Sequence, residues 1–545
     1  MKQIIYKSGI SLLLFSTMAL LCSGFWGCKN SPIDKVDPID SIDTIKPFVR
    51  LLENETIQSK IFNRELNYAV LLPENYDKST DSYPVVYLLH GFGDDHTAWN
   101  KYGLIKYYSD LYASEIVPMI FVMPQGFNSY YVNRFNGSVP YMDFFTSELV
   151  PAIDSIYRTK KDKTHRAVMG FSMGGYGALI LPAKNPDIFS ISVPLSMSFR
   201  TDEQYLAEPQ DVFNNQWGLI FGGFGTSGTY RLTNYFKDYS PFHFFDQSDL
   251  SQFSGLRLFL DCGDDEESLS VTNGALHNLM CDREIQHEYR VRNGGHSWDY
   301  WHKSLPEALV FISDGFKGVN YPENPEPVSI GTPIPSEKYT LENVNASELQ
   351  IGVFKPSTYD ADANLYPIIF FIHDYMGSSR SENALKIISL LNSNMQSGKI
   401  PQSMIIEIPI ESNEITSSVL TGIMDQINTN YRIVADKKGR VLMGNGVGGK
   451  ALCSLIPDFQ NIFNACFLFD AKLNTDVQAV PDMYYFVDLT DKSNNYSGNY
   501  NLYLNLRDKG NKHEYRVRQG TSSLQSILNG LNESMSYLST KLKNQ

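Results

Sequence analysis

Short apolar runs alternate with segments of helical periodicity between about residues 50 and 317. A continuous apolar run is typical of a strand covered on both faces, and strands that alternate with helices predict a mostly parallel sheet. The predicted strands are an edge strand at 67–73 and further strands at 83–91, 119–124, 167–169, 191–195, 256–261 and 287–292. A helix is predicted over 144–157, where apolar residues recur at helical spacing. The fold class expected from this pattern is α/β.

The segment 165–179 joins one of these strands to a helix through Gly170-Phe171-Ser172-Met173-Gly174. This Gly-x-Ser-x-Gly pattern is typical of a nucleophile elbow, a strained turn that holds a serine at the start of a helix. Glycine is needed two residues before and after the serine, because a Cβ there would collide with the neighbouring strand or helix. Free N–H groups at the helix start can stabilise negative charge. Ser172 is therefore predicted to be a catalytic nucleophile.

A serine nucleophile needs a base, and the base needs a carboxylate that orients it. His296 lies on the Gly-rich loop after the predicted strand 287–292, where it is free to reach Ser172. Two other histidines look helical and are expected at the surface: His277 and His302. The acid should follow the strand that ends at Asp261. The carboxylates available there are Asp264, Asp265, Glu266 and Glu267, most of which are expected to form a solvated acidic loop.

Four sequence blocks resemble the esterase D-type superfamily and, within it, carbohydrate esterase family 1, the feruloyl and acetylxylan esterases. The blocks are Tyr-Leu-Leu-His-Gly at 87–91, Gly-Phe-Ser-Met-Gly-Gly at 170–175, Leu-Asp-Cys-Gly at 260–263 and Gly-Gly-His-Ser-Trp at 294–298. The resemblance covers about residues 50–317. It implies an α/β-hydrolase fold and a serine esterase that acts on esterified plant polysaccharide or oligosaccharide, with no metal and no organic cofactor.

The same resemblance implies further site residues. The family's acid usually sits three residues after the glycine of the Asp-Cys-Gly block, and that position is Glu266 here, where the family generally has Asp. Asp265 is the alternative acid. The oxyanion hole would use the backbone N–H groups of Phe92 and Met173, and a single such donor is worth roughly 10²–10³ in kcat.

The chain after about residue 336 repeats the first unit. Tyr366–Asp374 mirrors Tyr83–Gly91, Val441–Gly449 mirrors Ala167–Gly175, and the hexapeptide His-Glu-Tyr-Arg-Val-Arg occurs at both 287–292 and 513–518. Three blocks in the same order indicate the duplication of a whole domain. We therefore expect two α/β-hydrolase-like domains in tandem.

The second copy is predicted to be shortened and catalytically degenerate. The replacements are Gly446 at the nucleophile position, Ser522 for His296, Ser493 near the position of Glu266, and Asp374 for Gly91. The copy also lacks much of the stretch that corresponds to residues 200–250, which is rich in aromatic residues and is expected to cap the site of the first copy. Packing, partner contact and carbohydrate binding are the roles open to it.

The expected domain boundaries follow from these patterns. They are a lipoprotein-type signal peptide at 1–28, a flexible tether at 29–49, the catalytic domain at 50–317, a proline-rich linker at 318–335 and the degenerate domain at 336–545. The signal peptide ends at Gly27-Cys28, which resembles a bacterial lipoprotein cleavage site with Cys28 as the lipidated residue; ordinary secretion is the alternative. We therefore expect a protein secreted through the inner membrane and lipid-anchored at the cell surface or in the periplasm of a bacterium.

Composition narrows the possible partners. The formal net charge of −14 argues against nucleic acid, since phosphate binding needs clustered Lys and Arg. Four of the six cysteines lie outside the leader and have no metal-type spacing: Cys262, Cys281, Cys453 and Cys466. They are expected to be buried free thiols, although a Cys262–Cys281 bridge is conceivable in an oxidising compartment.

Feruloyl ester on xylan is the preferred substrate, with acetylxylan as the alternative. A general aryl esterase or S-formylglutathione hydrolase is a further possibility, but the leader argues against a cytosolic thioester. A non-catalytic surface protein that binds glycan is a third, and the complete set of triad residues counts against it. The candidates for contact with the acyl group are Trp99, Tyr130 and Tyr131.

Overall fold

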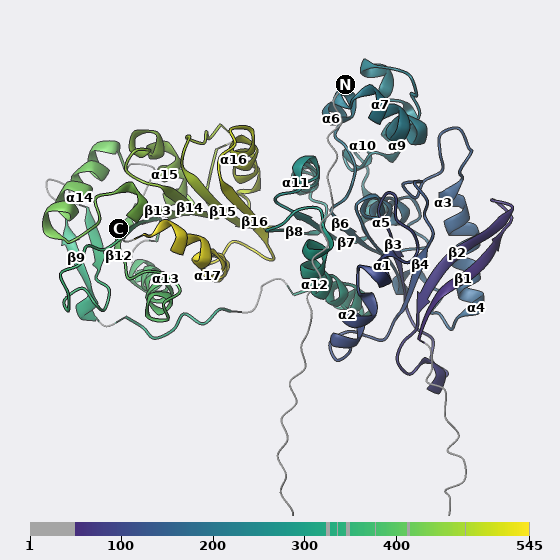
Figure 1. Ribbon diagram of the computed structural model, residues 1–545, viewed down its shortest axis with the longest axis horizontal. Coiled ribbons are helices and arrows are strands. Elements are labelled where there is room, and N and C mark those ends of the chain that lie inside the picture. The colour runs from purple at the N-terminus through teal and green to yellow at the C-terminus, as the bar shows by residue number, and fades with distance from the viewer. Residues whose placement is uncertain are drawn as a thin grey trace, which may run out of the picture. The chain divides into compact units, whose positions relative to one another are not determined.

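The computed structural model describes residues 50–322, 327–334, 336–344, 349–375, 378–410, 415–474 and 476–543. The chain from Val49 onward forms one compact unit (Figure 1). The expected signal peptide, the tether and the lipidation candidate Cys28 lie outside the described residues. None of the described helices combines the length and the apolar character that a membrane crossing requires.

Eight strands of the first half form a sheet in the order β1-β2-β4-β3-β5-β6-β7-β8. They are β1 (Leu51–Ser59), β2 (Arg64–Leu71), β3 (Val85–Leu89), β4 (Ile120–Pro124), β5 (Arg166–Phe171), β6 (Ile191–Leu195), β7 (Arg257–Gly263) and β8 (Glu288–Arg292). The pairs that involve β2 are antiparallel, and all pairs from β4 to β8 are parallel. The carboxyl ends of these parallel strands therefore share one edge of the sheet.

The prediction of an edge strand at 67–73 is wrong. The strand β2 lies inside the sheet, because β1 pairs along its outer side. The sequence of β1, Leu-Leu-Glu-Asn-Glu-Thr-Ile-Gln-Ser, contains no continuous apolar run, since the strand is largely exposed. Pattern alone therefore missed it.

Helices cover both faces of this half. One face packs against α1 (Ala98–Lys101), α2 (Ile105–Leu111) and α12 (Trp298–Lys317). The other packs against α4 (Val150–Ile156), α5 (Met173–Lys184) and α11 (Glu267–Asp282). The helix predicted at 144–157 is present as α3 (Tyr141–Phe144), the π-helical turn η2 (Phe145–Leu149) and α4.

Between β6 and β7 the chain forms a series of short helices. They are α6 (Asp202–Ala207), α7 (Gln210–Val212), η4 (Phe213–Trp217), α8 (Gly218–Phe221), η5 (Gly228–Arg231), α9 (Asn234–Tyr239), α10 (Pro241–Phe244) and η6 (Ser251–Phe253). Many aromatic rings of this insertion pack against one another: Tyr205 contacts Phe213, Trp217 and Phe236. These rings belong to the large apolar cluster that also contains Tyr130 and Tyr176, so the insertion packs on the rest of the first half.

The second half repeats the strand order of the first. Its strands are β9 (Tyr339–Asn343), β10 (Gln350–Phe354), β11 (Ile368–His373), β12 (Met404–Pro409), β13 (Arg440–Asn445), β14 (Ala465–Phe469), β15 (Tyr484–Thr490) and β16 (His513–Arg518), in the order β9-β10-β12-β11-β13-β14-β15-β16. Its helices are α13 (Ser378–Gln396), α14 (Ser417–Asn430), α15 (Gly446–Phe459), α16 (Tyr496–Asp508) and α17 (Leu524–Lys541). Between β14 and β15 the described residues 470–474 and 476–483 form no helix, in place of the helical insertion of the first half.

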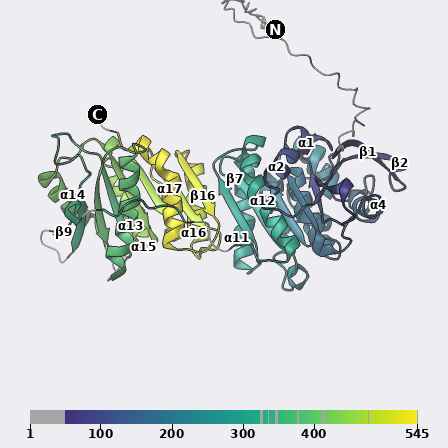
Figure 2. The same ribbon diagram turned by 90° about the horizontal axis from the view of Figure 1, so that it is seen from below.

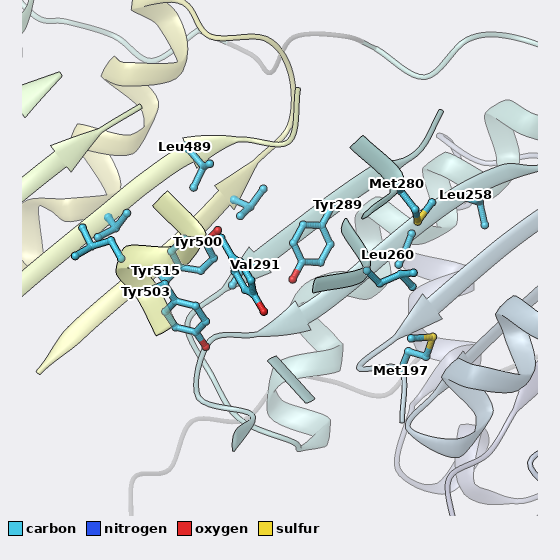
Figure 3. Packing of buried hydrophobic residues seen from close by; sticks show 14 of the residues in the cluster. Met197, Leu258, Leu260, Met280, Tyr289, Val291, Leu489, Tyr500, Tyr503 and Tyr515 are labelled. Carbon is cyan, nitrogen blue, oxygen red and sulfur yellow. The ribbon is translucent and has the colours of Figure 1, made fainter. Parts of the chain in front are cut away.

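The two halves meet edge to edge. The strands β8 and β16 pair antiparallel, with Val291 opposite Val517, so that one sheet of 16 strands runs through both halves (Figures 1 and 2). One cluster of buried apolar residues also continues across the junction. Figure 3 shows Tyr289 of β8 near the second-half residues Tyr500, Tyr503 and Tyr515 within this cluster.

The repeated hexapeptide forms this junction. Its central arginine reaches across in both directions: Arg290 Nη1 lies 2.6 Å from Asp491 Oδ2, and Arg516 Nη1 lies 2.5 Å from Asp264 Oδ2. Each aspartate also accepts a backbone N–H from the tyrosine that precedes the opposite arginine, at 3.1 Å in both cases. The junction is therefore close to two-fold symmetric, which gives the repeat a structural explanation.

Candidate active site at the end of strand β5

Ser172 lies between β5 and α5 with φ 58° and ψ −120°. A non-glycine residue at positive φ is strained, and such strain is common at catalytic positions. The two elbow glycines permit the turn. A Cβ on Gly170 would lie 2.2 Å from Gly174 O, and a Cβ on Gly174 would lie 2.2 Å from Leu89 O, so neither position tolerates a side chain without movement of the backbone.

His296 and Glu266 form a hydrogen-bonded pair. His296 lies on the loop between β8 and α12, and its Nδ1 is 2.8 Å from Glu266 Oε2. The side chain of Glu266 has no exposed surface, whereas that of His296 is 38% exposed. Asp265, the alternative acid, is exposed. Of the candidates, Glu266 is thus the one that the fold places behind the imidazole.

Ser196 and Trp301 belong to no sequence motif, but they support the Glu266 carboxylate, Ser196 directly and Trp301 through Ser196. Glu266 Oε1 accepts hydrogen bonds from the Ser196 hydroxyl and from Gly263 N–H, the latter at 2.9 Å. The Ser196 oxygen in turn accepts from the indole N–H of Trp301 at 2.8 Å. The Trp301 ring also stands 5.0 Å from the His296 ring at 85°. Trp301 therefore contacts the imidazole directly and is linked to the acid through Ser196.

Ser172 and His296 both follow parallel strands, at the sheet edge where ligands bind in open α/β sheets. Within the described part of the chain, no hydrogen bond involves the Ser172 hydroxyl. Catalytic hydrogen bonds are often long without substrate and tighten in the substrate complex. The structure therefore shows the acid–imidazole pair through its hydrogen bond. For Ser172, the support for a nucleophile is the strained backbone conformation.

Both amides named for the oxyanion hole flank this serine. Met173 N–H is the first of helix α5, where backbone donors have no partner within the helix. Phe92 follows Gly91, whose Cβ would lie 2.7 Å from the ring of Phe171, so only glycine lets this loop approach the elbow. Among the described residues, neither amide takes part in a hydrogen bond. Both donors remain available to a ligand.

Asp264 links the loop that carries His296 to the second half, a role that no sequence pattern indicates. Its Oδ1 accepts Gly294 N–H at 3.1 Å, two residues before His296. Its Oδ2 accepts from Arg516 and Tyr515 across the junction. Burial raises the pKa of Asp264, and Arg516 opposes that shift. One carboxylate of the acid loop thus fixes the histidine loop to β16.

The three aromatic candidates for acyl contact need correction. Trp99 and Tyr131 are at most 1% exposed, with Trp99 Nε1 donating to Leu89 O and the Tyr131 hydroxyl donating to His90 O. Tyr130 is equally buried, its ring packed on Trp217. These side chains support the site from inside. The exposed aromatic ring on the oxyanion loop is instead Phe92, at 48%.

The corresponding place in the second half is filled by the chain itself. Gly446 keeps a positive φ of 53°. The carboxylate of Asp374 accepts Val447 N–H at 3.2 Å, which is the amide equivalent to that of Met173, and lies 3.5 Å from Lys472 Nζ. Ser493 donates to Asp470, so the serine–carboxylate pair seen at Ser196 and Glu266 is present with its two members exchanged.

Strand order and the strained serine define residues 51–317 as an α/β-hydrolase fold. Residues 59–312 match the family model described as "Putative esterase".

Curated relatives match parts of the chain. An esterase of Mycobacterium tuberculosis is 40% identical over 121 residues, which are 21% of this chain and 25% of the relative. An endo-1,4-beta-xylanase/feruloyl esterase of Xylanibacter ruminicola is 36% identical over 131 residues, 22% of this chain and 18% of the relative. An acetyl esterase of Caldicellulosiruptor saccharolyticus is 25% identical over 269 residues, 47% of this chain and 95% of the relative.

The chain thus spans about a quarter of the length of the first of these relatives. Among solved structures, a ferulic acid esterase is 28% identical, and the match covers 49% of this chain and 98% of that one with a TM-score of 0.42.

Proposed function

We propose that the first half is a serine carboxylic-ester hydrolase that uses Ser172, His296 and Glu266. The observation that carries the proposal is the buried Glu266 carboxylate on His296 Nδ1, together with a serine held in the strained conformation of an elbow at the same edge of the sheet. A carboxylate in that place fixes the tautomer with Nε2 free to act as a base and stabilises the imidazolium that forms.

The reaction runs in two stages. His296 Nε2 takes the proton of the Ser172 hydroxyl as the oxygen attacks the ester carbonyl, and the oxyanion is stabilised by the Phe92 and Met173 amides. The imidazolium then gives its proton to the departing alcohol, which leaves an acyl-serine. Water, deprotonated by the same imidazole, attacks the acyl-serine and releases the acid.

We propose feruloyl esters on plant cell-wall polysaccharide, such as xylan, as the substrate. The similarity to the endo-1,4-beta-xylanase/feruloyl esterase supports this choice. Acetyl ester is the second candidate. It is favoured by the similarity to the acetyl esterase along 95% of that protein and by the burial of Trp99, Tyr130 and Tyr131, the three candidates for contact with the acyl group.

Release of ferulate and of acetate from esterified xylan tests both proposals. Wild type should release ferulate faster than acetate, and Ser172→Ala should release neither. Release of both acids by Ser172→Ala at the wild-type rate would refute the serine mechanism. Release of acetate alone by wild type would replace the substrate and leave the mechanism standing.

We propose further that the second half is a catalytically silent hydrolase-like domain. Gly446 has no side chain that could act as a nucleophile. The backbone amide that an oxyanion would need already donates to the Asp374 carboxylate. Its contacts to Asp264 support a role in holding the catalytic loops. The full chain with Ser172→Ala should therefore have no residual esterase activity on aryl esters.

We also propose lipid anchoring at Cys28, on the sequence alone. Radiolabelled palmitate should label the wild-type protein in a bacterial host and should not label Cys28→Ala. Equal labelling of the two would refute the anchor.

A further inference from the structure

Three residues of metal-binding type meet near the junction, away from Ser172. His277 and Cys281 lie one turn apart on α11, and His287 directly precedes β8. Residues four apart on a helix share one face. The three residues each offer one ligand atom, and these atoms all lie within 4.8 Å of one another. His277 Nδ1 is 2.8 Å from His287 Nε2, and Cys281 Sγ is 3.7 Å from His277 Nδ1.

We propose that His277, Cys281 and His287 bind one zinc ion. Zinc takes thiolate and imidazole ligands in tetrahedral sites, whose bond lengths place two nitrogens about 3.3 Å apart and a nitrogen and a sulfur about 3.6 Å apart. The observed sulfur–nitrogen distance matches this value. The two nitrogens need to separate by about 0.5 Å to reach the tetrahedral spacing, which a small rotation of either ring provides.

The His287 ring is already oriented for a metal. Its Nδ1–H donates to Ile285 O at 2.7 Å, so Nε2 presents its lone pair to His277 and Cys281. Metal-bound histidines commonly donate the other ring N–H to a backbone carbonyl in this way. Binding would release the Cys281 thiol proton and would require the His277 proton to move from Nδ1 to Nε2, so that the ring stays neutral while Nδ1 binds the metal.

A hollow supplies room for a fourth ligand. It measures about 410 Å³, and its lining includes Cys281, His287, Asp491, Lys492 and Tyr496. Two of the three proposed ligands thus face a space that water can enter. A site with three protein ligands and one open position accepts water as its fourth ligand.

The second half shows that packing does not require histidine and cysteine at the two helix positions, although it keeps a histidine at the third position. The positions equivalent to His277, Cys281 and His287 are Tyr503, Arg507 and His513. Tyr503 stacks on Tyr515 at 4.4 Å, much as His277 stacks on Tyr289 at 4.5 Å. Arg507 donates across the junction to Asp264 O. Histidine and cysteine together at the two helix positions of the first half therefore point to a ligand.

The sequence missed this site for two reasons. Spacing arguments considered the cysteines alone, and His277 was expected at the surface. His277 is in fact 2% exposed, because α16 covers α11 across the junction. The four cysteines outside the leader are free, so the conceivable Cys262–Cys281 bridge is not formed and Cys281 is available to a metal.

Metal retention by the full chain tests the proposal. The chelator-treated protein is mixed with excess zinc, passed through gel filtration and analysed for metal content. Cobalt is then substituted for zinc to look for a thiolate-to-cobalt charge-transfer band. The variants are Cys281→Ser and His287→Asn, and the matched control is His513→Asn, which alters the equivalent histidine beside Tyr503 and Arg507. Esterase activity verifies that each variant is folded, since none of these residues belongs to the proposed triad.

We expect one zinc per chain in wild type and His513→Asn, and at least a tenfold loss in Cys281→Ser and His287→Asn. The cobalt charge-transfer band should be absent in Cys281→Ser. Added zinc should raise the Tm of wild type and leave that of Cys281→Ser unchanged. Loss of zinc from wild type during gel filtration would overturn the proposal, as would wild-type zinc content or an unchanged cobalt band in Cys281→Ser.

Discussion

Glu266 and Asp265 are adjacent in the chain but lie in different surroundings. Glu266 is buried and accepts hydrogen bonds from His296, Ser196 and Gly263 N–H, whereas Asp265 is exposed. The turn after β7 points one carboxylate inward and the next outward. The pair therefore offers a test in which charge and position along the chain are nearly matched.

Glu266→Gln should lower kcat by roughly 10³–10⁴-fold, because an amide does not stabilise the imidazolium and favours the wrong tautomer. KM should change little, since the carboxylate does not contact the substrate. Steady-state hydrolysis of an aryl ester measures both values. Asp265→Asn should keep wild-type kcat. A larger loss in Asp265→Asn than in Glu266→Gln would assign the acid to Asp265.

Single residues also show what the sequence could supply. Ser172, His296 and the acid loop were predicted because each belongs to a short local pattern. Ser196 and Trp301 were not, because the hydrogen bonds from Trp301 to Ser196 and from Ser196 to Glu266 join three distant segments that share no motif. Trp99 and Tyr131 were predicted to contact the acyl group because they lie close to sequence motifs. The sequence does not show whether such an aromatic ring faces the core or the solvent.

The loops after β7 and β15 occupy equivalent positions in the two halves, and each contains a buried aspartate that contacts a neighbouring loop. The two differ in whether that neighbouring loop carries His296. Asp264 braces the loop that carries His296, and Asp491 accepts Gly520 N–H in the equivalent loop that carries no catalytic residue. Both aspartates accept an arginine and a tyrosine amide from the opposite half.

Asp264→Asn should therefore lower kcat by about 10- to 100-fold, a range typical of misplaced catalytic groups, while Asp491→Asn should leave kcat of the folded protein unchanged. Each loses one buried ion pair, so both variants should lose similar thermal stability. Parallel measurements of kcat and Tm separate positioning from stability. Equal losses of kcat in the two variants would contradict the bracing role.

In the second half, Glu407 of β12 ties three elements together. Its carboxylate accepts from His373 at 2.6 Å and from Arg380 at 2.8 Å, and it has no exposed surface. Burial alone would raise the pKa of Glu407, but the hydrogen bonds from His373 and Arg380 outweigh it and lower the pKa to about 2. The folded state thus binds the proton less readily than the unfolded chain.

This depressed pKa fixes the direction of a pH effect. The stability that Glu407 contributes is present above the ordinary carboxyl pKa of about 4.5 and is lost as the pH falls towards 2. Glu407→Gln should lower the free energy of unfolding at neutral pH by about 3 kcal/mol. The difference from wild type should shrink between about pH 4.5 and pH 2, as followed by urea unfolding. A difference independent of pH would contradict this account.

On the scale of the whole molecule, the halves share one sheet and one apolar core. Elements joined in this way unfold together, since opening either half exposes the junction of the other. Calorimetry should show a single thermal transition. After cleavage at a protease site inserted in the segment 318–335, the two fragments should still elute together from gel filtration. Two separate transitions or separated fragments would contradict a shared unit.

The sequence predicted the duplication but could not predict the joint. The hexapeptide was visible as a repeat, yet a strand gives no indication of which partner lies along its open edge. The pairing of β8 with β16 links residues more than 200 positions apart, and it is determined by the carboxylates of Asp264 and Asp491. Both carboxylates lie outside the repeated block, in the loops after β7 and β15.

The symmetry of that joint has a consequence for shorter proteins. At the edge that faces the other half, each half carries both an arginine that crosses the junction and an aspartate that accepts a hydrogen bond from the arginine of the other half. Such an edge is complementary to a second copy of itself, as the surfaces of isologous interfaces are. A chain that ends after α12 would thus carry both kinds of junction residue that it needs to bind a second copy of itself along the β8 edge. We expect it to form a homodimer with two copies of the proposed active site, in which a second copy of the first half takes the place that the second half has in the present chain.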